Sequence, residues 1–211
     1  MKILIGTTNP AKAGVFARQL EGYEVELLTL TDLGIRKHPD EDGKDPMENA
    51  MIKATYYGRF HDPVITEDSA LYIKELPMDD PRQPGLFVRR APDGHEMTDE
   101  EMTEHYAALA HSLGGRVTAY WLDGYAICKD GRVTGFMDDQ VSKVYAFYLV
   151  DKPHPNCHKG WPIDRLSVDI RTGRYLTDRD GGNLTAAKEE TVILSYQKKL
   201  NQFYIQALGL K

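Results

Sequence analysis

Cysteine and long apolar runs are largely missing from this sequence. Only two cysteines, Cys128 and Cys157, occur among the 211 residues, and they stand far apart. Two cysteines so far apart, without metal-type spacing, imply neither a disulfide framework nor a zinc site. No apolar run approaches the roughly 20 residues that a membrane-spanning helix needs, and Met1–Gly6 turns polar too soon for a signal peptide. We therefore expect a cytoplasmic protein with reduced thiols and no membrane partner.

An excess of positive charge is missing too. The 26 lysines and arginines are outnumbered by 32 aspartates and glutamates, so the formal net charge is -6. A general nucleic-acid binder needs a basic surface to displace phosphate counterions, so the net charge argues against this class. A small anionic ligand held by a few cations and a metal remains compatible with the charge. The length favours one α/β domain over residues 1–211.

The segment Val64–Ile73 carries the most prominent candidate chemistry. Val64, Ile65 and Thr66 read as a short buried strand that leads directly into Glu67 and Asp68. Side chains alternate along a strand, so these two acids are expected to point to opposite faces if the strand continues through them. One acid could then face a ligand while the other supports it, and the alternative is a solvated acidic turn.

Two further segments have the residue types of an anion site. Lys2–Thr7 predicts a strand, and Asn9 and Pro10 suit the N-cap and first position of a helix over Ala11–Leu20, whose free amides and Lys12 could bind an anion. The second helix is expected from Pro46 to Tyr57. In it Asn49 and Lys53 form an i, i+4 pair beside Glu48, suited to a metal and phosphate oxygens or to an ordinary solvated face.

The remaining pattern predicts further α/β structure. Strands are expected over 24–29, 117–128 and 133–150, a helix with a capping box from Thr98 to about Gly114, a hairpin around 171–174 and a terminal helix over 185–208. His154, Cys157 and His158 lie close together in a proline-rich loop. A metal role for them is the weaker reading, because no partner pair occurs elsewhere.

Four stretches together resemble one family, the inosine/xanthosine triphosphate pyrophosphatases. Thr7–Lys12 is similar to its phosphate loop T-G-N-x-x-K, and Glu48–Ala54 is very close to its E-N-A-x-x-K-A helix. Glu67–Leu71 looks like its acidic D/E-D-S/T-G-L segment, and Pro84–Arg90 resembles P-G-x-x-S-A-R. These enzymes hydrolyse non-standard purine nucleoside triphosphates to the monophosphate and pyrophosphate.

The resemblance implies an elongated mixed β-sheet with flanking helices, two lobes with a nucleotide-binding groove between them, a homodimer and dependence on Mg²⁺. It implies Glu48 and Asp68 as metal ligands, with Glu67 left open as an alternative, and Asp68, Glu48 and Lys12 as catalytic residues. The residues expected to bind the substrate are Thr7, Thr8, Asn9, Lys12, Asn49, Lys53, Ser69, Arg90, Trp161, Tyr196 and Gln197.

The C-terminal half departs from the family pattern. In place of F-G-Y/W-D-P the chain has Lys159–Asp164, in which the phenylalanine is absent and the aspartate is displaced. In place of S-H-R it has Ser195, Tyr196 and Gln197, with Lys188 as the nearest upstream lysine. A base-reading site discriminates through its particular hydrogen bonds, so we expect a changed base preference. The alternative function is nucleotide binding or regulation without turnover, but a binder has no need for a water-activating carboxylate.

Overall fold

The computed structural model describes residues 1–140, 145–178 and 187–211, and the side chains of 187–191 lie outside the description. Its strands are β1 (Lys2–Ile5), β2 (Glu26–Thr29), β3 (Val64–Ile73), β4 (Arg116–Lys129), β5 (Arg132–Met137), β6 (Phe147–Val150) and β7 (Ser167–Asp169). Its helices are α1 (Pro10–Gln19), α2 (Pro46–Tyr57), α3 (Asp99–Ser112), α5 (Ala187–Leu208) and two short 3₁₀ turns, η1 (Pro162–Leu166) and η2 (Leu176–Asp178).

The chain forms two compact units, and each is discontinuous in sequence. The first unit contains residues 1–69, 122–139 and 191–211, and the second contains 70–121 and 140–190. Strands β3 and β4 each contribute residues to both units. A cut of the chain at any single position would therefore not separate the units.

The strand order is β2-β1-β3-β4-β6-β7, with β5 pairing with β4. In the first unit β1 runs parallel to both β2 and β3, and β4 and β5 form an antiparallel hairpin. In the second unit β6 pairs antiparallel with β4 and with β7. The expected mixed α/β fold is confirmed.

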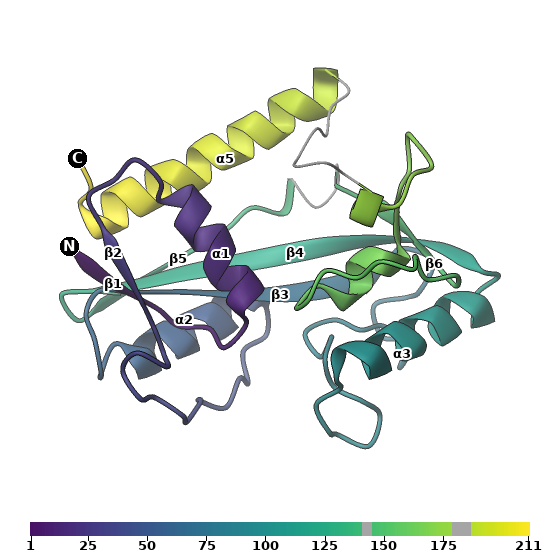
Figure 1. Cartoon of the computed structure of the whole chain (residues 1–211), viewed down its shortest axis with the longest axis horizontal. Coiled ribbons are helices and arrows are strands. Elements are labelled where there is room, and N and C mark those ends of the chain that lie inside the picture. Colours follow the sequence, from purple (N-terminus) through teal and green to yellow (C-terminus); the bar gives the residue numbers. More distant parts are fainter. Residues whose placement is uncertain (141–144, 179–186) are drawn as a thin grey trace. The chain divides into compact units, whose positions relative to one another are not determined.

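The first unit has apolar cores on both faces of its strands. Helices α1 and α5 cover one face and α2 covers the other (Figure 1). Alternation along the strands supplies both cores, since Ile3 and Ile5 face α1 and α5 while Leu4 faces α2. A strand buried on both faces reads as a continuous apolar run, which is how Lys2–Ile5 appears in the sequence.

In the second unit α3 packs against β6 and η1. Its start is a complete capping box, in which Thr98 and Glu101 satisfy each other's backbone amides. The buried Tyr106 of α3 donates a hydrogen bond to the Val88 carbonyl, 2.8 Å away. The capping box predicted from the sequence is thus present.

Several expected boundaries were wrong. The predicted strand over 133–150 is two strands, since β5 pairs with 124–129 of β4 and β6 pairs with 116–119. The polar run Asp138–Gln140 follows β5, and residues 141–144 of the predicted strand lie outside the described residues. Strand β3 continues past Thr66 to Ile73, and α5 is described from 187, so residues 185 and 186 of the predicted terminal helix lie outside the described residues.

The hairpin predicted around 171–174 follows β7, where the Gly173 amide donates to the Asp169 carbonyl and Val168 forms an isolated antiparallel bridge with Tyr175. In the part of the chain that the structure describes, no helix is both long and apolar enough to cross a bilayer.

Candidate active site

Parallel pairing of β1 with β3 brings the first two candidate segments together. Ile5 lies opposite Ile65, and the Gly6 amide donates to the Ile65 carbonyl at 2.8 Å. A Cβ atom on Gly6 would lie 2.6 Å from the Thr66 methyl group, so only glycine allows this approach. The segment that follows β1, Thr7–Lys12, is therefore placed beside Glu67–Ser69, which lie further along β3.

The turn before α1 is built as the sequence predicts. Asn9 is the N-cap, its Oδ1 atom accepts from the Ala11 amide at 2.9 Å, and Pro10 occupies the first helical position. The Thr7 hydroxyl accepts from the Asn9 amide at 3.1 Å, while the Thr8 side chain is exposed. The turn is thus held in shape by its own side chains at the positive end of the α1 dipole.

Lys12 reaches from α1 to the acidic segment of β3. Its ammonium lies 2.8 Å from Glu67 Oε2 and 3.3 Å from the Ser69 hydroxyl, and Ser69 in turn donates to Glu67 Oε1. The Glu67 side chain is only 9% exposed. A buried carboxylate of this kind needs a cation, and Lys12 supplies it.

Asp68 is held from α2 by two groups at once. Its Oδ2 atom accepts from the side-chain Nδ2 of Asn49 at 3.0 Å, and its Oδ1 atom accepts from the Lys53 ammonium at 2.9 Å. Lys53 also pairs with Glu41 at 2.9 Å. Burial alone would lower the pKa of Lys53, but the charges of Asp68 and Glu41 and their hydrogen bonds outweigh it and raise the pKa. Lys53 therefore stays positively charged beside these two acids.

Glu48 lies in the first turn of α2 and is oriented by the loop before it. Its Oε2 atom accepts from the Lys44 amide at 2.8 Å, and its own amide donates to the N-cap Asp45. The side-chain Oδ1 atom of Asn49 accepts from the Gly43 backbone amide at 2.8 Å. The loop before α2 thus fixes the side chains of Glu48 and Asn49, and Asn49 is one of the two groups that hold Asp68.

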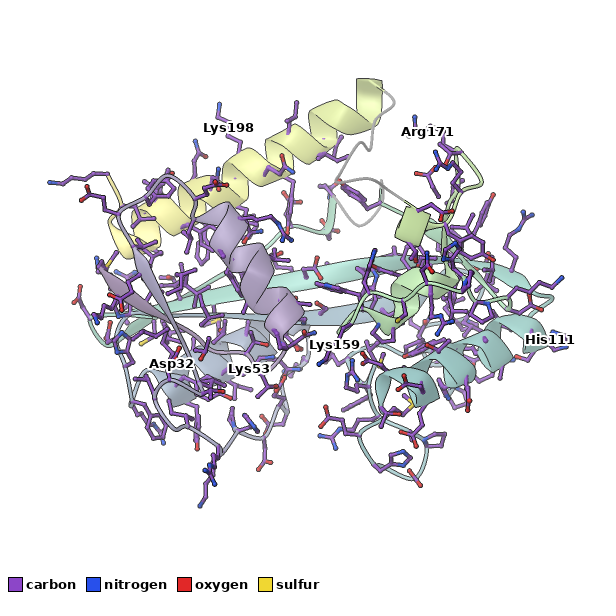
Figure 2. All side chains as sticks on the ribbon, in the orientation of Figure 1. Asp32, Lys53, His111, Lys159, Arg171 and Lys198 are labelled. Carbon is purple, nitrogen blue, oxygen red and sulfur yellow. The ribbon has the colours of Figure 1, made fainter. Side chains whose placement is uncertain are left out.

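Glu67 and Asp68 point to opposite faces of β3, as the strand pattern indicates. Glu67 pairs with a lysine of α1 and Asp68 with a lysine of α2, and these helices cover opposite faces. Figure 2 labels Lys53 on the α2 side of the strands. The solvated acidic turn is therefore excluded as a description of this segment.

Asp123 on β4 belongs to the same group of charges and was missed from the sequence. It is half-buried, and burial together with the nearby charge of Glu67 raises its pKa to about 6, while Lys12 and a hydrogen bond with Ser69 act in the opposite direction. The available signal was a single acid inside the apolar run 117–128. Such an acid marks either a turn or a functional position.

Tyr196 and Gln197 on α5 do not make polar contacts with the segments just described. The Tyr196 ring packs on Phe136, and its buried hydroxyl has no hydrogen-bond partner among the described residues. Gln197 is exposed and lines a surface hollow of about 700 Å³ with Arg18 and Tyr23, at the C-terminal end of α1.

The second unit contains Arg90 and Trp161. Arg90 is exposed and Trp161 is half-buried at the start of η1. In the nearby loop His154 pairs with Asp178 at 3.0 Å, so its ring already has a partner. Lys188 belongs to the part of α5 whose side chains lie outside the description.

Comparison with known proteins decides the family. The model of the Ham1 family matches residues 3–142, which include both lysines and all the acids of the first unit described above. The chain belongs to the Ham1 family. This Ham1 chain is 31% identical over 146 residues to a dITP/XTP pyrophosphatase of Thermus thermophilus, covering 64% of the chain and 67% of that protein.

A second relative matches a shorter region. A dITP/XTP pyrophosphatase of Thermoanaerobacter pseudethanolicus is 37% identical over 91 residues, covering 43% of the Ham1 chain and 44% of that protein. The chain thus spans about half the length of such relatives in the alignments. Solved Ham1 proteins of Staphylococcus aureus and Coxiella burnetii share the fold at 18% identity, with TM-scores of 0.65 and 0.69, covering 96% and 98% of this chain and 99% and 100% of theirs.

Proposed function

We propose that this Ham1 protein is a Mg²⁺-dependent nucleoside triphosphate pyrophosphatase that releases the monophosphate and pyrophosphate. The observation that carries the proposal is the pair of lysine–carboxylate contacts on the two faces of β3. Lys12 and Lys53 supply cations for the triphosphate, and Asp68 is a carboxylate already oriented by two donors. Attack on a polyanion needs neutralised charge and an aligned water molecule, which these groups can provide.

The donor chemistry fits Mg²⁺ as the metal. Glu48 and Asp68 offer carboxylate oxygens, and within the described ranges no group of three or more histidine, cysteine, aspartate or glutamate side chains is arranged to hold a metal. Mg²⁺ is characteristically bound by one or two carboxylates, substrate phosphates and water rather than by an all-protein cage. When bound, it supplies charge neutralisation and an acidified water molecule.

The protein's own residues then have separate tasks. Asn49 and Lys53 hold the carboxylate of Asp68 so that it can accept the proton of the attacking water. The triphosphate competes with the acids for Lys12 and Lys53, whose ammonium groups each carry three donors. Thr7, Thr8 and the amides that begin α1 bind the phosphate oxygens at the helix N-terminus.

The two lysines give a direct prediction. Replacing Lys12 or Lys53 by alanine is expected to raise the KM for a nucleoside triphosphate about tenfold or more, because each change removes a cation from the phosphate site. Initial rates of pyrophosphate release measure this, and Lys198→Ala, on the surface of α5, is the matched control (Figure 2). Unchanged KM and kcat in both variants would show that these lysines do not bind the substrate.

The base preference is proposed to differ from inosine and xanthosine. Trp161 offers an aromatic surface on which a base can stack, which contributes roughly 1–3 kcal/mol to binding without distinguishing one base from another. Arg90 is retained from the family motif. Tyr196 and Gln197 are neutral at the positions where the family has cations. A panel of canonical, deaminated and modified triphosphates, assayed for pyrophosphate with Mg²⁺, is expected to show no strong preference for inosine triphosphate. A hundredfold advantage in kcat/KM for that nucleotide would contradict this. Binding without any turnover would favour the regulatory alternative.

The proposal extends to assembly and location. We propose a cytoplasmic homodimer in which residues 1–211 act as one domain, since β3 and β4 contribute residues to both units. Light scattering of the purified chain tests the dimer.

A further inference from the structure

Asp99, the first residue of α3, joins two segments of the second unit that lie far apart in the sequence. Its Oδ1 atom accepts from both terminal nitrogens of the Arg89 guanidinium, each at 3.0 Å. Its Oδ2 atom accepts from the backbone amide of Gly160, also at 3.0 Å. One carboxylate therefore ties the Pro84–Arg90 motif to the turn that precedes Trp161.

Arg89 fixes the orientation of this carboxylate. Its Nη1 atom also donates to the Met97 carbonyl at 3.0 Å, so the guanidinium is held by two groups. The side chains of Arg89 and Asp99 are 33% and 27% exposed, so solvent screens the ion pair only in part. Arg89 stands where the motif P-G-x-x-S-A-R has alanine, and an alanine could not form this pair. Because Oδ1 is occupied by Arg89, Oδ2 is directed to Gly160.

The turn that Asp99 holds is the one that leads into Trp161. Gly160 has a φ of +83°, a left-handed conformation that favours glycine, and the Trp161 amide donates to the His158 carbonyl at 2.9 Å. After Trp161 the chain enters η1, where Ile163 is buried in the core of the unit. The half-buried Trp161 is thus fixed by the core on one side and by the hydrogen bond from Gly160 to Asp99 on the other.

We infer that Asp99 is a positioning residue for base binding: by holding the Gly160 turn, it fixes the Trp161 ring where a nucleobase stacks on it. Arg89 orients Asp99 for this task. The inference rests on the proposed function for the nature of the ligand. A stacking contact contributes fully only when the ring is held before the base arrives, because ordering a loose turn on binding costs conformational entropy. The effect is confined to the base, since the lysines proposed to bind phosphate belong to the first unit.

Loss of the Asp99 carboxylate is expected to weaken nucleotide binding without weakening polyphosphate binding. Stacking does not distinguish bases, so guanosine triphosphate is the probe. We expect Asp99→Ala to raise its Kd about five- to twentyfold, while the Kd for inorganic tripolyphosphate stays within about twofold of the wild-type value. Isothermal calorimetry of the full chain in metal-free buffer measures both values without turnover.

Arg89→Ala is a second variant, which installs the alanine of the family motif and leaves Asp99 in place. It is expected to raise the Kd for guanosine triphosphate about two- to fivefold, because Asp99 keeps its contact with Gly160 but loses the partner that orients it. Circular dichroism shows whether each variant is folded. If Asp99→Ala does not fold, Arg89→Ala decides the test.

Two controls isolate the contact with the Trp161 turn. Glu100→Ala removes a neighbouring exposed acid from the same first turn of α3, so it makes the same change in charge at the same helix terminus. Both Kd values of this control are expected to stay within about twofold of the wild type. In a Trp161→Ala background, Asp99→Ala is expected to give less than a twofold further loss, because the residue through which Asp99 acts is gone.

Several results would overturn the inference. These are an unchanged Kd for guanosine triphosphate in the folded variants, an equal loss of tripolyphosphate binding in Asp99→Ala, an undiminished loss in the Trp161→Ala background, and no binding of guanosine triphosphate by the wild type. If the expected changes in Kd occur but the wild type releases no pyrophosphate from any nucleotide with Mg²⁺, the proposed function alone is contradicted. Calorimetry therefore separates the two failures.

Discussion

Asp68→Asn is expected to lower the rate of pyrophosphate release about a hundredfold or more, the loss typical of removing a general base or a metal ligand. Asparagine keeps the shape of the side chain and can still accept from Lys53. It cannot take a proton from water or offer a charged oxygen to a metal. Lys53 also retains Glu41 as a partner, so its positive charge is not left alone.

The fold of this variant is expected to persist. Thermal unfolding should show a loss of about 1–3 kcal/mol, since the new side chain keeps the hydrogen bond from Lys53 but places an amide donor against the donor of Asn49. Asp138→Asn is the matched control, because it makes the same chemical change at an acid paired with Lys199. Near-normal pyrophosphate release by folded Asp68→Asn would show that another residue acts as the general base or metal ligand.

Gly124→Ala is expected to destabilise the protein by about 3 kcal/mol or more, the upper range for overpacking of a closely packed site. A Cβ atom on Gly124 of β4 would lie 2.2 Å from the Met47 amide nitrogen and 2.3 Å from the Pro46 carbonyl carbon. These are backbone atoms of the first turn of α2, which cannot rotate away. The helix start would have to move, and Glu48 and Asn49 would move with it.

Chemical denaturation measures this loss, and Gly14→Ala is the control. Gly14 lies inside α1, where an added Cβ would meet only the end of Arg18 at 3.8 Å. Alanine there should stabilise the protein by about 0.5–1 kcal/mol through its better helix propensity. Similar unfolding midpoints for both variants would show that α2 and β4 are less closely packed than their backbones indicate.

The local features were the ones that sequence reasoning predicted well. Asn9 caps α1, and Thr98 forms a capping box with Glu101. Both caps could be predicted because a cap depends on residues three positions apart or fewer. The errors lay where partners are distant. Whether 133–150 is one strand depends on which part of β4 each segment meets, and no local pattern contains that information.

The residues of the candidate site also divide into those that the sequence predicted and one that only the structure revealed. The motifs in the sequence identified Lys12, Lys53, Glu67 and Asp68 as candidate site residues. They left open whether one acid faces a ligand while the other supports it, or whether both belong to a solvated turn. Asp123 carried only a weak signal, a single acid in an apolar run. Its proximity to Ser69 exists because β4 passes beside β3, which is a long-range pairing.

By itself the sequence determined the local elements, the family and the chemical types available for phosphate and metal binding, because these follow from side-chain identity and short spacing. The tertiary structure decided which lysine meets which acid. Alternation along β3 sends Glu67 toward α1 and Asp68 toward α2, and the pairing of β1 with β3 sets both acids beside the turn that begins α1. Lys12 and Ser69 lie 57 positions apart in the sequence, and Lys53 and Asp68 lie 15 apart, so short-range preferences do not specify these contacts.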